Sequence, residues 1–325
     1  MGWLAFALYV LGVVGMLATI LPLWRTTRWW VRVCDFPRFQ IALLCLALMA
    51  CWPFILPMTA PSWIFFGALA ATLAWQLSWI WPYLPGTPRQ ILSTEAKPDA
   101  AARIAVLTAN VLQTNRDVDR LVRVIVAADP DVVLAVETDE WWCSELKSAL
   151  HTRYPHVVQY PLSNGYGLSL LSRLELIDPE IRFVIDEAIP SIRTGVRLRA
   201  GPTVDLYCVH PQPPAPQQDS TERDLELTLV AREIAARGRP SILMGDLNDV
   251  AWSPSTLRFA QVGKLLDPRR GRGFFNTYPA GLPGLRYPLD YVFTTGHFGV
   301  ARMQVLPKFG SDHLPLLAEL HLRGG

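Results

Sequence analysis

Hydrophobic residues are distributed unevenly along this chain. Its first part contains three long uncharged apolar runs, at 3–24, 40–58 and 63–83, with Trp or Tyr near their ends. A helix needs roughly 20 apolar residues to cross a bilayer core, and aromatic rings suit the headgroup zone. The pattern predicts about three transmembrane helices within residues 1–84. Two helices are the alternative, if the run interrupted by Pro53 enters the bilayer and returns.

The basic residues predict the orientation of these helices. The loop between the first two runs contains one acidic residue, Asp35, and four arginines: Arg25, Arg28, Arg32 and Arg38. The positive-inside rule places this loop in the cytoplasm, and three helices return the chain to that side, where Arg89 and Lys97 agree. We therefore expect an integral protein of a bacterial inner membrane with a cytoplasmic catalytic domain; two helices would reverse the side. A cleaved secretory signal is disfavoured, because two more apolar runs follow.

After the apolar runs, residues 85–101 have the Pro, Gly, Ser and charged composition of a linker. From 102 to 325, short β-rich runs alternate with amphipathic helical patterns, of which 221–238 is the clearest. The runs 194–200 and 203–210 predict a hairpin. Because strands follow one another with few helices between them, a mixed or antiparallel sandwich flanked by helices fits better than regular βαβ winding.

The amino-acid composition restricts the class of protein but does not identify a function. The chain has 325 residues, of which 51% are hydrophobic, and the apolar runs account for most of that excess. The net charge of +2 is too small to point by itself to a polyanionic partner. The five cysteines have neither metal-ligand nor disulfide spacing, so they are most simply free thiols, which favours a reducing compartment.

Polar residues recur at the ends of the predicted strands. They are Asn110, Glu137, His210, Asp246, Asn248, Asp290, Asp312 and His313. Each has an ordinary explanation by itself, since Asn and Asp at strand ends commonly make turns. Their shared position is harder to explain in that way, because the strand ends of one sandwich converge on one rim.

Phosphoester hydrolysis requires such a set of groups. A carboxylate such as Glu137 suits Mg²⁺, which prefers oxygen ligands and would neutralise phosphate charge. Asp246 could take a proton from the attacking water, and Asn248, on the same strand face, could orient that water. A His–Asp pair could stabilise the pentacovalent species from the opposite side.

Two of these segments carry a resemblance to a known family. "GDLND" (245–249) and "SDHLPL" (311–316) are similar to the signature pair of the endonuclease/exonuclease/phosphatase superfamily, and "LTANV", "VVLAVET", "YCVHP" and "PLDYVFTT" match further motifs in order. The resemblance spans about 102–321. It implies a four-layer α/β/β/α sandwich, here preceded by the transmembrane region, and a hydrolase of ester bonds that uses Mg²⁺, with Mn²⁺ as a substitute.

The resemblance implies a role for each matched residue. Glu137 would bind the metal, assisted by Asn110 and Asp312. Asp246 would position or deprotonate the nucleophilic water, with Asn248 beside it.

The remaining matches would contact the phosphate. His313 would touch the scissile group and be oriented by Asp290, while His210 would bind a phosphate oxygen or serve near the leaving group. Tyr166 matches a phosphate-contacting tyrosine, with a structural role as the alternative. One departure is Val136, which stands where nucleases of the family commonly have Gln.

The substrate stays open between nucleic acid and a phospholipid headgroup. The segment 264–279 sets aromatic rings beside a group of basic residues: Lys264, Arg269, Arg270 and Arg272. The three arginines would suit a nucleic acid backbone as substrate-binding residues, or they belong to a solvated loop that faces lipid headgroups. The membrane anchor favours membrane lipid, and no obligate protein partner is evident. A membrane-tethered nucleic-acid-binding or scaffold protein with little or no catalysis is the alternative, which the intact carboxylates disfavour.

Overall fold

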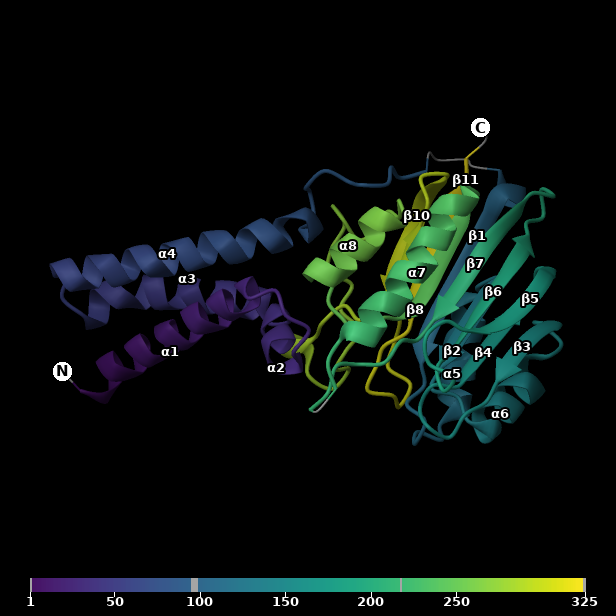
Figure 1. The fold of residues 1–325 in the computed structure, drawn as a ribbon, viewed down its shortest axis with the longest axis horizontal. Helices are drawn as coiled ribbons and strands as arrows, with labels where there is room; N and C mark the ends of the chain where they lie inside the picture. Colours follow the sequence, from purple (N-terminus) through teal and green to yellow (C-terminus); the bar gives the residue numbers. More distant parts are fainter. Residues whose placement is uncertain (1, 95–98, 217, 324–325) are drawn as a thin grey trace.

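The computed structural model describes residues 2–94, 99–216 and 218–323. Lys97, which the sequence places in the linker on the cytoplasmic side, lies outside the described residues. The molecule has two parts, an elongated helical bundle and a two-sheet sandwich, which lie side by side (Figure 1).

Three long helices form the N-terminal bundle: α1 (Trp3–Ile20), α3 (Arg38–Ile55) and α4 (Ala60–Ile80). They pack around Trp52, which is fully buried and contacts the rings of Tyr9 and Phe65. Many outward side chains are apolar and exposed, as at Phe54, which is 90% exposed. With the short turns after α1 and α4 included, each helix is long and apolar enough to cross a membrane.

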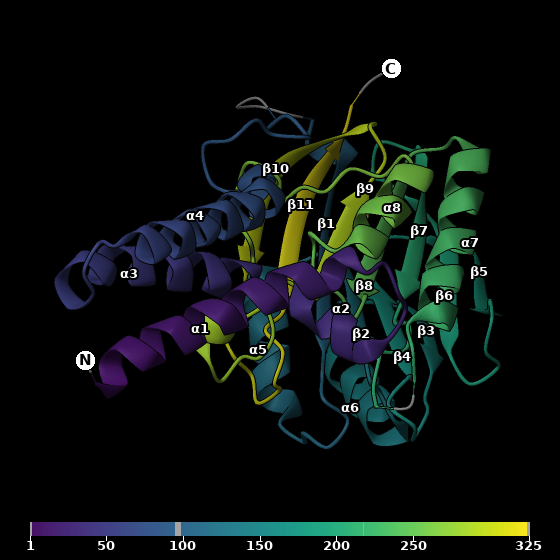
Figure 2. The ribbon, with the colours of Figure 1, turned by 60° about the vertical axis from the view of Figure 1, so that its left-hand side comes forward.

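The loop between α1 and α3 is itself structured. It contains the short helix α2 (Trp29–Arg32), followed by a 3₁₀ turn at Val33–Asp35. Figure 2 shows α2 against the sandwich, at the end of the bundle where α1 finishes and α3 begins. The basic loop therefore contacts the folded domain.

The sandwich consists of two mixed sheets with strand orders β10-β11-β1-β2-β4-β3 and β5-β6-β7-β8-β9. The strands of the first sheet are β1 (Arg103–Asn110), β2 (Val132–Val136), β3 (His156–Tyr160), β4 (Leu168–Ser172), β10 (Phe298–Val305) and β11 (Leu316–Leu322). Those of the second are β5 (Leu176–Phe183), β6 (Pro190–Arg197), β7 (Thr203–Val209), β8 (Ser241–Asp246) and β9 (Asp290–Thr294). The pairs β1–β2 and β7–β8 are parallel, and β6–β7 form the hairpin expected from the sequence.

The expected four layers are confirmed. Between the sheets lies a core of side chains such as Val106, Leu134, Leu206 and Met244. The first sheet is covered by α5 (Val118–Ala128) and α6 (Glu140–Leu150), and the second by α7 (Thr221–Arg237) and α8 (Pro254–Val262). The strands β1, β2 and β8 are buried on both faces, which explains their uninterrupted apolar sequences.

The parallel pairs bring the polar strand ends to one rim. β1, β2, β7 and β8 all finish there, and β9 begins there, because Asp246 pairs with Asp290 in the ladder. Gly245 makes the last step of β8 possible: its φ is 143°, and an added Cβ would lie 1.8 Å from the carbonyl oxygen of Val209. Only glycine tolerates both the conformation and this close approach.

The bundle is attached to the sandwich through buried hydrogen bonds near α8. The hydroxyl of Tyr83, at the end of the third helical segment, donates to the carbonyl of Ala251 at 2.7 Å. The indole of the next residue, Trp252, donates to the carbonyl of Asp35 at 2.7 Å. Apolar side chains of both parts, including Ala42 and Ile80, share one cluster with Trp252.

The first part of the predicted linker is also ordered against the sandwich. The amide of Val300 in β10 donates to the carbonyl of Leu92 at 3.2 Å, and the amide of Thr94 donates to the carbonyl of Val300 at 3.1 Å. The chain thus continues from the third helix along the edge of the first sheet before it enters β1.

Candidate active site

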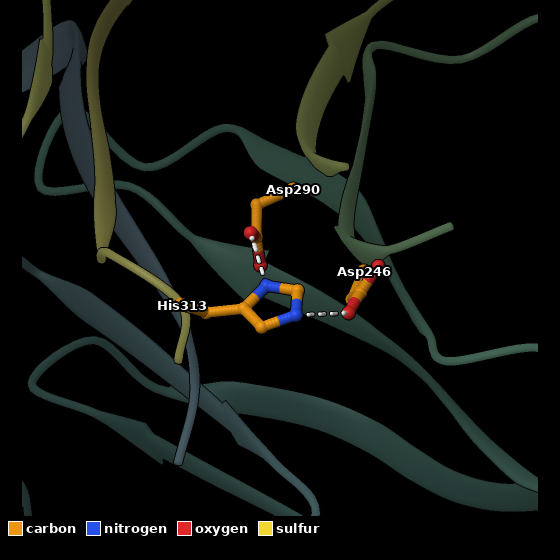
Figure 3. A group of neighbouring side chains, drawn as sticks. All are labelled: Asp246, Asp290 and His313. Atoms are coloured by element: carbon orange, nitrogen blue, oxygen red, sulfur yellow. Dashed lines mark hydrogen bonds and ion pairs between the residues drawn. The ribbon is translucent and has the colours of Figure 1, made fainter. Parts of the chain in front are cut away.

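Two carboxylates and an imidazole form a chain of polar contacts at the rim (Figure 3). His313, in the loop before β11, places Nδ1 2.9 Å from Oδ2 of Asp290 and Nε2 3.6 Å from Oδ2 of Asp246. Both aspartates are fully buried and His313 is 5% exposed. The ring of Tyr278 packs on the imidazole, with centroids 4.8 Å apart.

The two aspartates hold His313 in its charged form. Burial disfavours the imidazolium, but the charges of Asp290 and Asp246 outweigh this effect and raise the pKa of His313 to about 10. Burial raises the pKa of the Asp246 carboxyl, an effect that the positive charge of His313 opposes. At neutral pH both ring nitrogens of His313 are therefore donors.

Asn110 connects this group to Glu137. Its Nδ2 donates to Oε1 of Glu137 at 2.7 Å and to Oδ2 of Asp246 at 3.1 Å. Its Oδ1 accepts from the amide of Leu112 at 2.9 Å and so points away from both carboxylates. This orientation turns the side-chain nitrogen toward the carboxylates, and the role of Asn110 in assisting metal binding stays a prediction.

Glu137 stands at the end of β2 in a strained conformation. Its φ is 64°, in the left-handed region that costs a non-glycine residue on the order of 1 kcal/mol. Burial raises the pKa of its carboxyl, and hydrogen bonds from Asn110 and the amide of Gln113 oppose that rise. The charge of Asp312 contributes a further rise.

Asn248 supports Asp246 through its backbone rather than its side chain. Its amide donates to Oδ1 of Asp246 at 2.9 Å, and its φ of 53° is again left-handed. The side-chain Nδ2 donates to the carbonyl of Pro211 at 3.0 Å. The side-chain amide of Asn248 is thus held toward the loop that follows β7.

His210 and Tyr166 lie together on the same rim. His210 ends β7, is 3% exposed, and has no hydrogen-bond partner for Nδ1 among the described residues. Burial lowers the pKa of its imidazole, so the ring is neutral at pH 7. The rings of Tyr166 and His210 have centroids 5.5 Å apart.

The contacts of the three arginines of the basic segment lie elsewhere, and their role in substrate binding stays a prediction. Arg269 is 1% exposed, pairs with Asp267 at 2.9 Å and lies 3.8 Å from the centroid of the Tyr291 ring.

The other two arginines contact the segment that follows the third helix. Arg272 donates to the carbonyl of Ile91 at 2.8 Å, and Arg270 lies 5.9 Å from the ring centroid of Tyr83. Arg270 and Arg272 therefore contribute to the junction between the third helical segment and the sandwich, whereas the contacts of Arg269 lie within the sandwich.

Sequence reasoning missed Arg223. This residue of α7 is 2% exposed and donates to the carbonyl of Asn248 at 3.0 Å and to Asp249 at 3.0 Å. The sequence feature that could have identified Arg223 is its position one turn before Leu227, on the apolar face of a helix. A charged side chain buried there requires a partner.

Comparisons with known proteins agree with this geometry. A model of the Endonuclease/Exonuclease/phosphatase family matches residues 107–313, well over half of the chain. A comparison with curated proteins finds no match.

Solved structures share the fold at low identity. An endonuclease/exonuclease/phosphatase from Beutenbergia cavernae is 21% identical, with a TM-score of 0.57. The match covers 69% of this chain and 72% of that chain. D. rerio TDP2 humanized by 14 mutations is 19% identical, with a TM-score of 0.56, and the match covers 68% of this chain and 99% of that chain. Sphingomyelinase C from Streptomyces griseocarneus is 20% identical, with a TM-score of 0.51, and the match covers 67% of this chain and 99% of that chain. The chain belongs to the endonuclease/exonuclease/phosphatase family.

Proposed function

We propose that this protein is a membrane-anchored, divalent-metal-dependent phosphoester hydrolase. The observation that carries the proposal is the continuous set of contacts from Asp290 through His313, Asp246 and Asn110 to Glu137, all at one rim of the sandwich. Ion pairs that serve stability alone do not require four ionisable groups and an amide at the ends of five separate strands and loops.

The donors at the rim fit a hard divalent cation. Glu137 and Asp312 would supply carboxylate oxygens, which Mg²⁺ and Mn²⁺ prefer. Asn110 would orient Glu137 through its Nδ2 hydrogen bond. When bound, the cation would neutralise phosphate charge and favour the leaving oxygen.

Residues of the chain carry out the proton transfer and bind the phosphate. Asp246, fixed by the amide of Asn248, accepts a proton from the attacking water; the raised pKa of its carboxyl favours that transfer. His313 donates Nε2–H to a phosphate oxygen and stabilises the negative charge of the pentacovalent species. Asp290 holds the imidazolium by accepting from Nδ1. His210, neutral and buried, binds a further phosphate oxygen, with Tyr166 beside it.

The three apolar helices support a location in a membrane, which we take to be a bacterial inner membrane. The arginine-rich loop between α1 and α3 favours a catalytic domain on the cytoplasmic side. Among proteins of similar fold, D. rerio TDP2 has been solved with a single strand DNA product, and another is a sphingomyelinase. Nucleic acid and a phospholipid headgroup are accordingly the two substrate classes to test.

The test uses the full chain in detergent with bis(p-nitrophenyl) phosphate, p-nitrophenyl phosphate, a DNA oligonucleotide and phospholipid micelles. Asp246→Asn and His313→Ala should each lower kcat at least about 100-fold on the substrate that is cleaved. Asp119→Asn and His151→Ala, on exposed sites of α5 and at the end of α6, are the matched controls and should change it less than about twofold. Near-normal kcat in Asp246→Asn would reject the proposal.

A further inference from the structure

One loop of the catalytic rim extends to the level at which the helical bundle begins. This loop, residues 279–287, lies between Tyr278 and β9 and contains a 3₁₀ turn at Pro283–Leu285. The carbonyl of Gly284 accepts a hydrogen bond from Nε2 of Gln40, at 3.3 Å. Gln40 is in the first turn of α3, so the tip of the loop lies beside the start of an apolar helix long enough to cross a membrane (Figure 2).

The base of the same loop is joined to the catalytic residues. The amide of Ala280 donates to the carbonyl of Asp312 at 2.6 Å, next to His313 in sequence. Nη2 of Arg286 donates to the carbonyl of Ala280 at 2.6 Å, which closes the loop on itself. The loop therefore holds a defined shape between the phosphate-binding histidine and the helical bundle.

The tip of the loop is apolar and uncovered. Leu282 is 56% exposed and Leu285 is 48% exposed, and no acidic residue occurs between them. Packing of Tyr287 on Phe36, with ring centroids 5.4 Å apart, joins the loop to the end of the bundle.

Exposed tryptophans lie in the same interhelical loop as Phe36, which contacts Tyr287. Trp24, Trp29 and Trp30, in the loop between α1 and α3, are 53%, 38% and 38% exposed. Tryptophans at this position relative to apolar helices occupy the headgroup zone of a bilayer. Leucines that project at that depth contact the boundary between headgroups and acyl chains, where apolar side chains of interfacial segments are buried.

From these contacts we infer that loop 279–287 sits in the membrane interface and that the hydrolysed phosphoester belongs to a membrane lipid. This inference rests on the proposed hydrolase function. The phosphate of a lipid lies at the depth of the loop, so a headgroup moving in the plane of the membrane enters the rim beside His313. Water forms a new P–O bond, one P–O ester bond breaks, and the leaving oxygen takes the proton that water loses.

The test compares a lipid substrate with a soluble one in the same enzyme. The full chain is reconstituted with Mg²⁺ into vesicles of phosphatidylethanolamine, phosphatidylglycerol and cardiolipin, and loss of lipid phosphodiester is followed by ³¹P NMR. Hydrolysis of bis(p-nitrophenyl) phosphate and of a single-stranded DNA oligonucleotide is measured in the same preparation. The double variant Leu282→Asp/Leu285→Asp should lower lipid turnover at least about tenfold and leave hydrolysis of the soluble diester unchanged.

Two further variants control for charge and for loss of structure. Leu282→Phe/Leu285→Phe keeps an apolar tip and should retain lipid turnover. Ile181→Asp places the same charge on an exposed side chain of β5, at the opposite edge of the sheet from β9, and should leave both activities unchanged. An environment-sensitive fluorophore on Leu282→Cys, with Cys34 and Cys51 replaced by Ser, should shift to the blue when the protein enters vesicles.

The outcomes separate this inference from the proposed function. Cleavage of DNA or the soluble diester without cleavage of any vesicle lipid would overturn the lipid inference and leave the hydrolase intact. Unchanged lipid turnover in the double Asp variant would also overturn it. A wild-type chain that hydrolyses none of these substrates would reject both.

Discussion

Arg32 and Asp249 form an ion pair across 217 residues of sequence, with Nη2 of Arg32 2.8 Å from Oδ2 of Asp249. Arg32 belongs to the loop between α1 and α3, whereas Asp249 lies three residues after the proposed general base. Arg223 binds the same carboxylate oxygen and also the carbonyl of Asn248. The loop between two candidate membrane helices thus supports the backbone that positions Asp246.

We expect Arg32→Ala to lower kcat at least about tenfold, because a small displacement of Asn248 moves the carboxylate that it fixes. Stability should fall by only about 1–3 kcal/mol, since Arg223 continues to neutralise Asp249. Steady-state kinetics and thermal unfolding of the detergent-solubilised chain measure the two effects. Arg28→Ala, exposed in the same loop, serves as control. Equal kcat values for the two variants would show that the pair does not position the site.

Metal dependence is expected to act through Glu137. A chelator should abolish activity, and Mg²⁺ or Mn²⁺ should restore it. Glu137→Gln should weaken the apparent Mg²⁺ affinity at least about tenfold, because an uncharged amide replaces a carboxylate ligand. Mg²⁺ titrations of activity and of the thermal midpoint measure this change. Glu140→Gln, exposed at the start of α6, should behave as the wild type, and an unaltered titration of Glu137→Gln would contradict the assignment.

Stability should depend on pH through Glu226. Burial in α7, with a smaller contribution from the charge of Asp186, raises the pKa of its carboxyl to about 7. A carboxyl whose pKa is higher in the folded state is favourable while protonated. Its contribution to the free energy of unfolding is therefore lost as pH rises from about 4.5 through about 7.

Replacement of Glu226 by Gln removes this dependence. The variant should match the wild type near pH 4.5 and exceed it by on the order of 3 kcal/mol at pH 8.5. Urea unfolding followed by tryptophan fluorescence at both pH values gives the difference. Glu222→Gln, exposed one turn earlier in the same helix, should show no such trend. A gain that is equal at both pH values would refute the electrostatic origin.

Arg269 should matter for stability and not for substrate binding. Arg269→Ala leaves Asp267 buried without its partner, which costs about 3–5 kcal/mol. The KM for the soluble diester should stay within about twofold of the wild-type value. The double variant Arg269→Met/Asp267→Leu should recover most of the loss, because an apolar pair can replace a buried ion pair. An increase in KM with unchanged stability would restore the substrate-binding interpretation.

The order of the elements and the members of the rim followed from local patterns. Short apolar, β-rich runs predicted β1, β2, β8 and the β6–β7 hairpin, because buried strands and amphipathic helices impose different patterns on the sequence. Polar residues at the strand ends identified the rim, since strands of one sandwich finish at shared edges. Edge strands were less well defined. The sequence "IRFVID" (181–186) predicts a strand, but β5 begins five residues earlier, at Leu176, because an exposed edge strand has little need for apolar side chains.

What the sequence by itself determined is therefore which segments form strands and helices and which polar side chains end them. The direction in which each side chain points was decided by tertiary contacts. Packing of the two sheets brought Asn110 to Asp246, and the acceptors around Arg272 drew it to the segment after the third helix. Burial set Arg269 on the ring of Tyr291, and packing of the bundle brought Arg32 to Asp249. Periodicity is a property of neighbouring residues, whereas burial and hydrogen-bond partners arise only when distant segments pack together.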